Sequence, residues 1–204
     1  MGPAGLWGSG RSYLLPSGTG ILRFRKTLGR RSENRFALKT EPTQAAPPRK
    51  KLHLTLIAVG RITEPYIRDG CAAYVERIRR YAELRLIVVP EERTPGKGKR
   101  EYILRQEGQR IRGKLSRALF TVVLDERGKC FSSEAFALFL EKFAGKDMAF
   151  VLGGPYGLDE PLKKEADFIL SLSPMTLVHT MARMLLLEQI YRAFTLLRGE
   201  PYHK

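Results

Sequence analysis

The sequence predicts an α/β fold, a mostly parallel sheet flanked by helices, in residues 51–204. Short apolar runs alternate there with longer segments whose apolar residues recur every three or four positions. The short runs are typical of buried strands and the longer periodic segments of helices. Gly or Pro stands at several of the boundaries, among them Gly60, Pro90 and Gly145. Strands that alternate with helices are typical of a parallel sheet, because each helix returns the chain to the same end of the sheet.

Residues 1–50 differ from the rest of the chain in composition. They show no strand alternation and no sustained helical stripe, and Gly, Ser, Pro and Arg are prominent among them. We expect this basic N-terminal extension to be disordered and the folded domain to occupy residues 51–204. An Arg-rich, acid-poor extension also fits an organelle transit peptide. The alternative is an extension without a targeting role, in which case we expect a cytoplasmic protein.

The first half of the domain contains two predicted strands and two predicted helices. Residues Leu52–Val59 (LHLTLIAV) predict a strand, and residues 84–89 predict another. Residues 64–81 between them predict a helix, because its apolar side chains fall on one face: Ile67, Cys71, Tyr74, Val75 and Ile78. Residues 100–115 predict a helix rich in Arg and Gln. The basic loop before it, residues 91–99, is either a solvated connection or a phosphate contact.

A third strand and a third helix follow. Residues 119–124 (LFTVVL) predict a buried strand, and the polar residues 125–129 (DERGK) predict a turn after it. The polar residues 132–134 (SSE) can cap the next helix, and that helix is expected to continue to Ala144 before Gly145 ends it.

Two short strands near the C terminus each end in a tight loop. Residues 148–152 lead into a loop with the sequence GGPYG, residues 153–157, and after a short helix residues 168–172 lead into SPMT, residues 173–176. Ligands of open α/β sheets bind outside the carboxyl ends of the strands, so the two loops predict a small-molecule pocket. Taken singly, the first loop could be only a tight turn and the second only a polar cap. Neither matches a dinucleotide fingerprint or a P-loop.

The last predicted helix, residues 178–198, has apolar side chains on more than one face. They are Met181, Ala182, Met184, Leu185, Leu186, Leu187, Ile190, Tyr191, Phe194 and Leu197. A helix with a single buried face would not need them all. The sheet can cover one side, and a second subunit is a simple source of cover for the other, which predicts a homodimer. The alternative is a helix fully buried within a monomer.

The net charge of the chain is +15, of which residues 1–50 carry +8 and residues 51–204 the remaining +7. A basic domain of this kind is compatible with a nucleic-acid partner, although a solvated surface would also account for it. Cys71 and Cys130 and the three histidines lack the spacing of a metal site or a disulfide framework, so we expect neither. No apolar run is long enough to span a membrane. No acid–base constellation stands out, which favours a bound cofactor that carries the reactive group.

Several stretches of residues 51–204, in order along the chain, resemble the RlmH family. This family comprises SPOUT-class methyltransferases that modify a pseudouridine in large-subunit ribosomal RNA. The matching stretches are LIAVG (56–60), EGQRI (107–111), VLDERGK (123–129), SSE (132–134), LGGPYGL (152–158), LSLSPMTLVH (170–179), LLLEQIYRAF (185–194) and RGEPYHK (198–204).

The resemblance implies a fold, a cofactor and an assembly. It implies a SPOUT-type α/β domain with a C-terminal trefoil knot, a homodimer with its sites near the interface, and S-adenosylmethionine as the methyl donor. The residues that it implies for the donor pocket are Leu124, Gly154, Ser173, Pro174, Met175, Thr176, Leu177 and Val178. Val178 departs from the family pattern, in which Pro is common at this position.

The resemblance also implies the acceptor, N3 of a pseudouridine in large-subunit (23S) ribosomal RNA. Arg192, Tyr202 and His203 are the candidates for the catalytic, RNA-facing side, with His203 a candidate for accepting the N3 proton. Two other functions remain open. One is a non-catalytic, basic RNA-binding or ribosome-assembly factor, and the other is a SPOUT methyltransferase that acts on transfer RNA.

Overall fold

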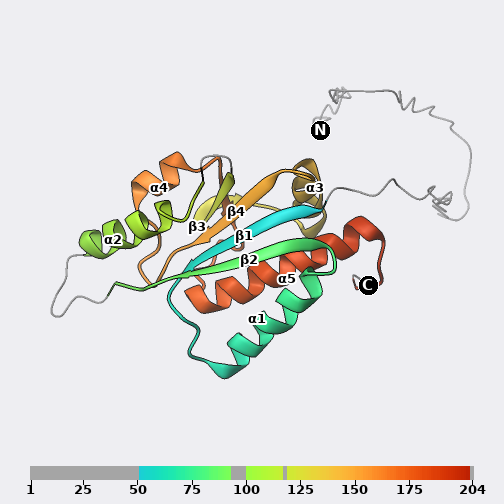
Figure 1. Cartoon of the computed structure of the whole chain (residues 1–204), viewed down its shortest axis with the longest axis horizontal. Helices are drawn as coiled ribbons and strands as arrows, with labels where there is room; N and C mark the ends of the chain where they lie inside the picture. The colour runs from blue at the N-terminus through green and yellow to red at the C-terminus, as the bar shows by residue number, and fades with distance from the viewer. Residues whose placement is uncertain (1–50, 93–99, 117–118, 203–204) are drawn as a thin grey trace, which may run out of the picture. The chain divides into compact units, whose positions relative to one another are not determined.

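The structure of the chain is a computed structural model, which describes residues 51–92, 100–116 and 119–202 (Figure 1). The expected disorder of residues 1–50 and most of the basic loop, residues 93–99, lie outside the described residues. The described part forms a five-stranded sheet in the order β2-β1-β4-β3-β5, and every strand pair is parallel. The predicted α/β class with a parallel sheet flanked by helices is therefore confirmed.

Strands and helices alternate along the whole described domain. The elements are β1 Leu52–Val59, α1 Pro65–Ile78, β2 Ala82–Val89, α2 Arg100–Arg112, β3 Phe120–Cys130, α3 Ser133–Lys142, β4 Asp147–Leu152, α4 Glu160–Glu165, β5 Phe168–Ser171 and α5 His179–Arg198. Apart from the end of β3, their bounds lie within a few residues of the predicted ones. The predicted cap of α3 is confirmed, because the Ser132 Oγ atom accepts a hydrogen bond from the Ala135 N–H group at 3.2 Å.

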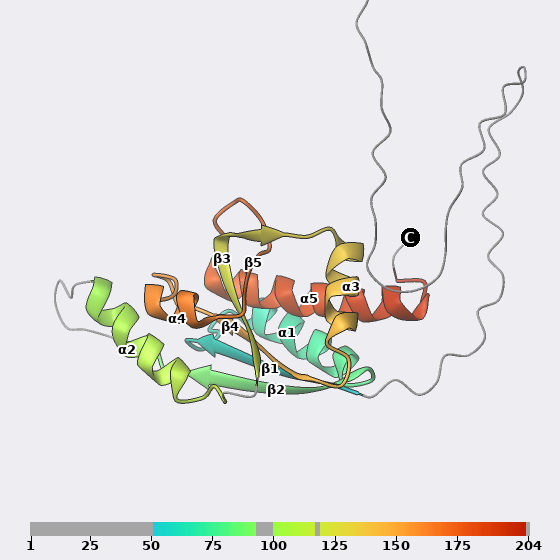
Figure 2. The same ribbon diagram turned by 90° about the horizontal axis from the view of Figure 1, so that it is seen from above.

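The helices cover the sheet on both faces. On one face α1, α3 and α5 pack over a core that contains Leu54, Phe150 and Leu186. On the other face α2 and α4 pack over a smaller core that contains Ile57 and Val151. Residues Met148–Leu152 of β4 are at most 3% exposed, because this strand lies at the centre of the sheet between β1 and β3. Figure 2 shows α2 and α4 together at one end of the domain and α3 at the other.

The predicted turn at residues 125–129 is wrong. Strand β3 continues through this segment to Cys130, and its pairing with β5 resumes after a bulge. Leu124 and Lys129 both pair with Leu170 of β5, so the intervening residues bulge out of the ladder. Gly128 allows the close approach, since a Cβ atom there would lie 2.7 Å from the Leu170 carbonyl carbon. A bulge uses the same Gly and polar residues as a turn, and only the partner strand distinguishes the two.

Helix α5 lies between α1 and α3 on its face of the sheet (Figure 1). These neighbours cover the flanks of α5, so part of its many-sided apolar pattern is explained within one chain. Leu186, Leu187 and Ile190 are fully buried. Met181, Met184, Leu185 and Leu197 are only partly buried. The apolar pattern alone therefore does not decide between the monomer and the predicted homodimer.

Candidate functional site

A cavity of about 720 Å³ opens at the carboxyl ends of β4 and β5 and beside the bulge in β3. Three chain segments form most of its wall: the β3 bulge (124–127), the loop after β4 (152–158) and the loop after β5 with the start of α5 (172–179). Arg100 of α2 and Lys163 of α4 contribute to the rim. The volume is within the range of small-molecule sites, and the position is the one expected for an open α/β sheet.

Seven of the eight residues predicted to bind the cofactor line this cavity. They are Leu124, Gly154, Ser173, Met175, Thr176, Leu177 and Val178. Pro174 lies between two of them but is not part of the cavity wall. The structure thus brings together two loops and the bulge of β3, which are separated in the sequence.

Glycine is required in the loop after β4 because the backbone folds back on itself. The Gly157 N–H group donates a hydrogen bond to the Gly154 carbonyl oxygen at 3.0 Å. Gly157 has a φ of 87°, a conformation that favours glycine. A Cβ atom at Gly153 would lie only 2.2 Å from the Gly157 carbonyl oxygen. The loop consequently presents bare backbone to the cavity, where a flat ligand can approach closely.

Short hydrogen-bonded turns hold the loop after β5. The Ser171 hydroxyl group donates to the Ser173 carbonyl oxygen, and the Met175 N–H group donates to Ser173 Oγ, each at 2.9 Å. Thr176 Oγ1 donates to Glu126 Oε2 at 2.8 Å, which ties this loop to the β3 bulge. The two sides of the cavity mouth are therefore joined by a side-chain contact.

An ion pair lies at the α4 side of the cavity. Lys163 Nζ is 2.6 Å from Asp125 Oδ2 and 3.1 Å from Glu160 Oε1. Burial alone would raise the pKa of Asp125, but the hydrogen bonds from Lys163 and from the Arg127 N–H group lower the pKa below its ordinary value. Asp125 is accordingly a paired, ionised carboxylate.

Sequence patterns indicate no role for Glu107, yet its carboxyl group lies directly behind the glycine loop. The residue is 2% exposed, and Oε1 accepts a hydrogen bond from the Glu92 N–H group at 3.0 Å. Oε2 has no hydrogen-bond partner among the described residues and would lie 3.2 Å from a Cβ atom at Gly154. Burial, with a smaller contribution from Glu91, raises the pKa of Glu107. The only sequence signal was an acidic residue on the apolar face of a helix.

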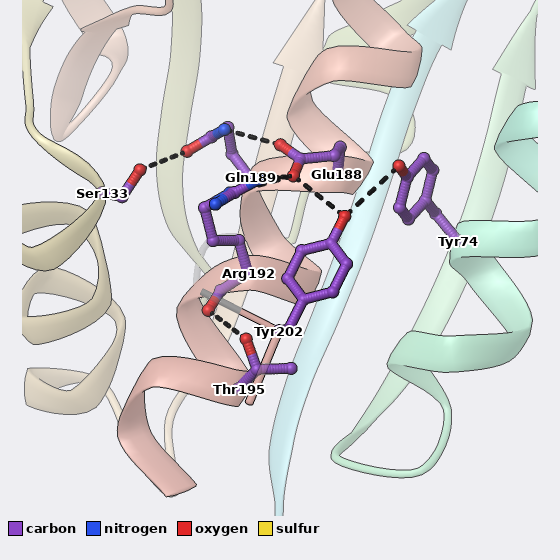
Figure 3. Close-up of polar contacts among 7 residues, drawn as sticks. All are labelled: Tyr74, Ser133, Glu188, Gln189, Arg192, Thr195 and Tyr202. Carbon is purple, nitrogen blue, oxygen red and sulfur yellow. Dashed lines mark hydrogen bonds and ion pairs between the residues drawn. The ribbon is translucent and has the colours of Figure 1, made fainter. Parts of the chain in front are cut away.

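The predicted RNA-facing residues lie elsewhere. Figure 3 shows Arg192 and Tyr202 converging on Glu188. Arg192 Nη2 lies 2.8 Å from Glu188 Oε1, and Tyr202 Oη donates to the same oxygen at 3.2 Å. Tyr202 Oη is also 3.5 Å from Tyr74 Oη. Burial, followed by the contact with Tyr74 and the charge of Glu188, raises the pKa of Tyr202. His203 lies outside the described residues.

Helix α5 separates this cluster from the cavity. His179, at the start of the helix, lines the cavity, whereas Arg192 is thirteen residues further along. At 1.5 Å per residue the two positions are about 20 Å apart along the helix axis. Figure 2 shows α5 starting at the end of the domain where α4 lies, on the other face of the sheet, and ending beyond α3. One chain therefore does not bring the predicted cofactor residues together with Arg192 and Tyr202, the two predicted catalytic residues that the structure describes.

The described residues show neither a metal-binding group nor a membrane-spanning helix. Within 51–92, 100–116 and 119–202, no group of three or more His, Cys, Asp or Glu side chains could hold a metal ion. The same part of the chain contains no helix that is long and apolar enough to cross a membrane.

Residues 52–203 match the family described as "Predicted SPOUT methyltransferase". Similar curated proteins carry the name "Ribosomal RNA large subunit methyltransferase H". The one from Syntrophotalea carbinolica is 44% identical over 155 residues, which cover 74% of this chain and 99% of that protein. The one from Carboxydothermus hydrogenoformans is 41% identical over 159 residues, which cover 75% of this chain and all of that protein.

Among solved structures, the chain is similar to a probable methylase family protein from Haemophilus influenzae. The TM-score is 0.44 and the sequence identity 15%, over 76% of this chain and 71% of the other.

Proposed function

Because the chain belongs to the SPOUT methyltransferase family, we propose that it transfers a methyl group from S-adenosylmethionine to N3 of a pseudouridine in large-subunit ribosomal RNA. The composition of the cavity wall is the main support for this proposal. The cavity wall contains seven residues implied for the donor pocket, in a chain that aligns with nearly the full length of a named ribosomal RNA methyltransferase.

The cavity fits the donor in size and in the character of its wall. A volume of about 720 Å³ accommodates a nucleoside with an amino-acid side arm. Gly154 and the Ser173–Val178 loop (173–178) would hold the adenine and ribose through backbone groups, and Leu124 would pack against the ring. When bound, S-adenosylmethionine supplies a methyl group that is already strongly electrophilic.

The task of the protein is then positioning. N3 of the acceptor lies between two carbonyl groups, so its N–H bond is acidic for an amide and its anion is a competent nucleophile. The chain must hold this atom in line with the methyl group and exclude water. Met175 and Val178 are 75% and 64% exposed at the mouth of the cavity, where apolar side chains are suited to being covered by another surface.

We further propose that the active form is a homodimer in which each site uses both chains. The separation of about 20 Å along α5 motivates this assembly. A two-fold axis that places two α5 helices antiparallel would bring Arg192, Tyr202 and His203 of one chain to the cavity of the other. The exposed Met175 and Val178 and the partly buried residues of α5 would supply apolar contacts.

The trefoil knot implied by the family resemblance belongs to the same proposal. Its support is the match of residues 52–203 to the SPOUT methyltransferase family. The acceptor would place the protein with ribosomes in the cytoplasm, or in an organelle if residues 1–50 are a transit peptide.

The proposed reaction is tested with tritiated S-adenosylmethionine and four acceptors: assembled ribosomes, large subunits, free ribosomal RNA and transfer RNA. We expect label in the large-subunit RNA, and nucleoside digestion should recover it as a pseudouridine methylated at N3. Label in transfer RNA alone would support the transfer-RNA enzyme. Absence of both donor binding and methyl transfer, in a folded protein that binds the RNA, would support the non-catalytic factor.

A further inference from the structure

His179 lies at the boundary between the cofactor cavity and the carboxyl end of β1. It is the first residue of α5 and lines the cavity. Its Nε2 atom is 3.7 Å from the position that a Cβ atom on Gly60 would occupy, just after β1. Strand β1 pairs with β2 on one side and with β4 on the other. The chain leaves β1 toward β2 and leaves β4 toward β5, which lies on the opposite side, so the strand order changes direction between β1 and β4. Such a switch point is where open α/β sheets bind ligands.

Charged groups from three directions face the imidazole. Arg183, on the next turn of α5, donates from Nη2 to the Val59 and Gly60 carbonyl oxygens, each at 2.9 Å, and lies near Cys71 of α1. Glu91 follows β2 and Glu64 precedes α1. Burial and Arg183 lower the pKa of His179, and the two carboxylates oppose them with smaller effects. The N-terminal end of a helix also disfavours a positive charge. The ring is therefore neutral at neutral pH and keeps a free lone pair.

The other titratable side chains of the cavity wall are poorly suited to accept a proton. They are Arg100, Asp125, Glu126, Arg127, Tyr156, Glu160 and Lys163. A guanidinium or ammonium group has no lone pair to offer, and a carboxylate is a weak base for an N–H group. Asp125 is moreover paired with Lys163, and Glu126 already accepts a hydrogen bond from Thr176. Among the described residues of the wall, His179 is the best-matched base.

We propose that His179 is the general base of the methyl transfer and that the acceptor ring binds between the cofactor cavity and the carboxyl end of β1. This inference rests on the proposed function. In the step, the N3–H bond breaks and the proton passes to an imidazole nitrogen. The electron pair left on N3 forms a bond to the methyl carbon, and the bond between that carbon and sulfur breaks with its pair retained by sulfur. The neutral thioether product remains, and the imidazolium returns its proton to water.

The test compares His179→Gln and His179→Ala with His53→Gln, a matched control. His53 is exposed on β1, and its ring faces Glu83 and Asp147 away from the cavity. Single-turnover transfer is measured from pH 5 to 8 with saturating donor and RNA, and donor affinity is measured by calorimetry. We expect both His179 variants to lose about 100-fold or more in rate. Donor affinity should stay within about threefold of wild type, a difference of well under 1 kcal/mol.

The pH profile separates a base from a structural residue. In the wild type the rate should fall on the acid side with a midpoint below the ordinary histidine pKa of about 6.5, because burial and Arg183 lower the pKa of His179. His179→Gln should lose this limb, and added imidazole should partly restore His179→Ala. His203→Ala provides a comparison and should keep the limb, whatever its effect on RNA binding.

Three results would overturn the assignment: a His179→Gln rate close to wild type, an unchanged acid limb in that variant, or a loss of donor binding that accounts for the lost rate. A wild-type protein that transfers no methyl group would instead refute the proposed function, before any variant is compared.

Discussion

Gly153→Ala is expected to weaken the binding of S-adenosylmethionine strongly while the domain still folds. The added methyl group would lie 2.2 Å from the Gly157 carbonyl oxygen and 2.4 Å from its carbon. Both atoms belong to the backbone, so the Gly154–Gly157 pairing must open to relieve the clash. Forcing a methyl group into a closed site costs about 1–3 kcal/mol. If the substitution distorts the cofactor loop and the whole free-energy cost is lost from donor binding, donor affinity drops by about 5- to 150-fold.

Calorimetry against the donor measures this effect, with circular dichroism to confirm the fold. Gly113→Ala is the matched control, because a Cβ atom there meets its nearest atoms, the Arg110 and Gln109 carbonyl oxygens, at 3.5 and 3.7 Å, ordinary contact distances. The control should bind like the wild type. If a folded Gly153→Ala protein bound the donor with wild-type affinity, this loop would not form the donor site.

Two inactive variants should restore activity to each other when their chains are mixed. Gly154→Leu would disable the donor side, where a Cβ atom already lies 3.1 Å from Val59 Cγ1. Tyr202→Ala would disable the opposite end of α5, where Tyr202 contacts Glu188 and Tyr74. If each site uses both chains, a mixed dimer keeps one intact site. Random exchange of subunits in a two-fold dimer then gives about a quarter of wild-type activity.

Co-expression with two different affinity tags and tandem purification would isolate the mixed dimer. Each variant dimer alone should remain inactive. A mixed dimer that is as inactive as its parents would contradict a shared site, as would a sedimentation experiment that finds a single chain at the assay concentration.

Most of the parallel sheet could be predicted because its strands are apolar on both faces. Leu54 and Phe150 face one core of the sheet and Val151 faces the other, and all three are buried. Continuous apolar runs of this kind are easily distinguished in the sequence from the periodic pattern of the helices. The continuation of β3 beyond Leu124 could not be predicted. Its polar residues are also those of a turn, and only pairing with Leu170 of β5 makes them a strand.

The cavity was predictable from its loops, but the groups behind it were not. Glycine and serine loops after two successive strands indicate a pocket whatever the ligand. Glu107 lies almost 50 residues before Gly154 in the sequence, and nothing local indicates that its carboxyl group lies behind that glycine. His179 was likewise an isolated histidine until the fold placed it beside Gly60. Contacts between distant segments decide both cases.

The separation of Arg192 and Tyr202 from the cavity is also a property of the folded chain. In the sequence these residues follow the cavity-lining loop closely, and the single uninterrupted helix α5 carries them away from it. Because a helix of known length has a fixed rise, the distance follows once the helix is recognised. This distance is the reason that the proposed site needs a second chain.

The central claim is that the loops after β4 and β5 hold the methyl donor. A crystal structure of the protein with S-adenosylhomocysteine, the product of methyl transfer, tests it most directly. We expect the product in the cavity beside Gly154, with its adenine and ribose against the backbone of residues 173–178. Product bound at another place on the protein, with this cavity left empty, would contradict it.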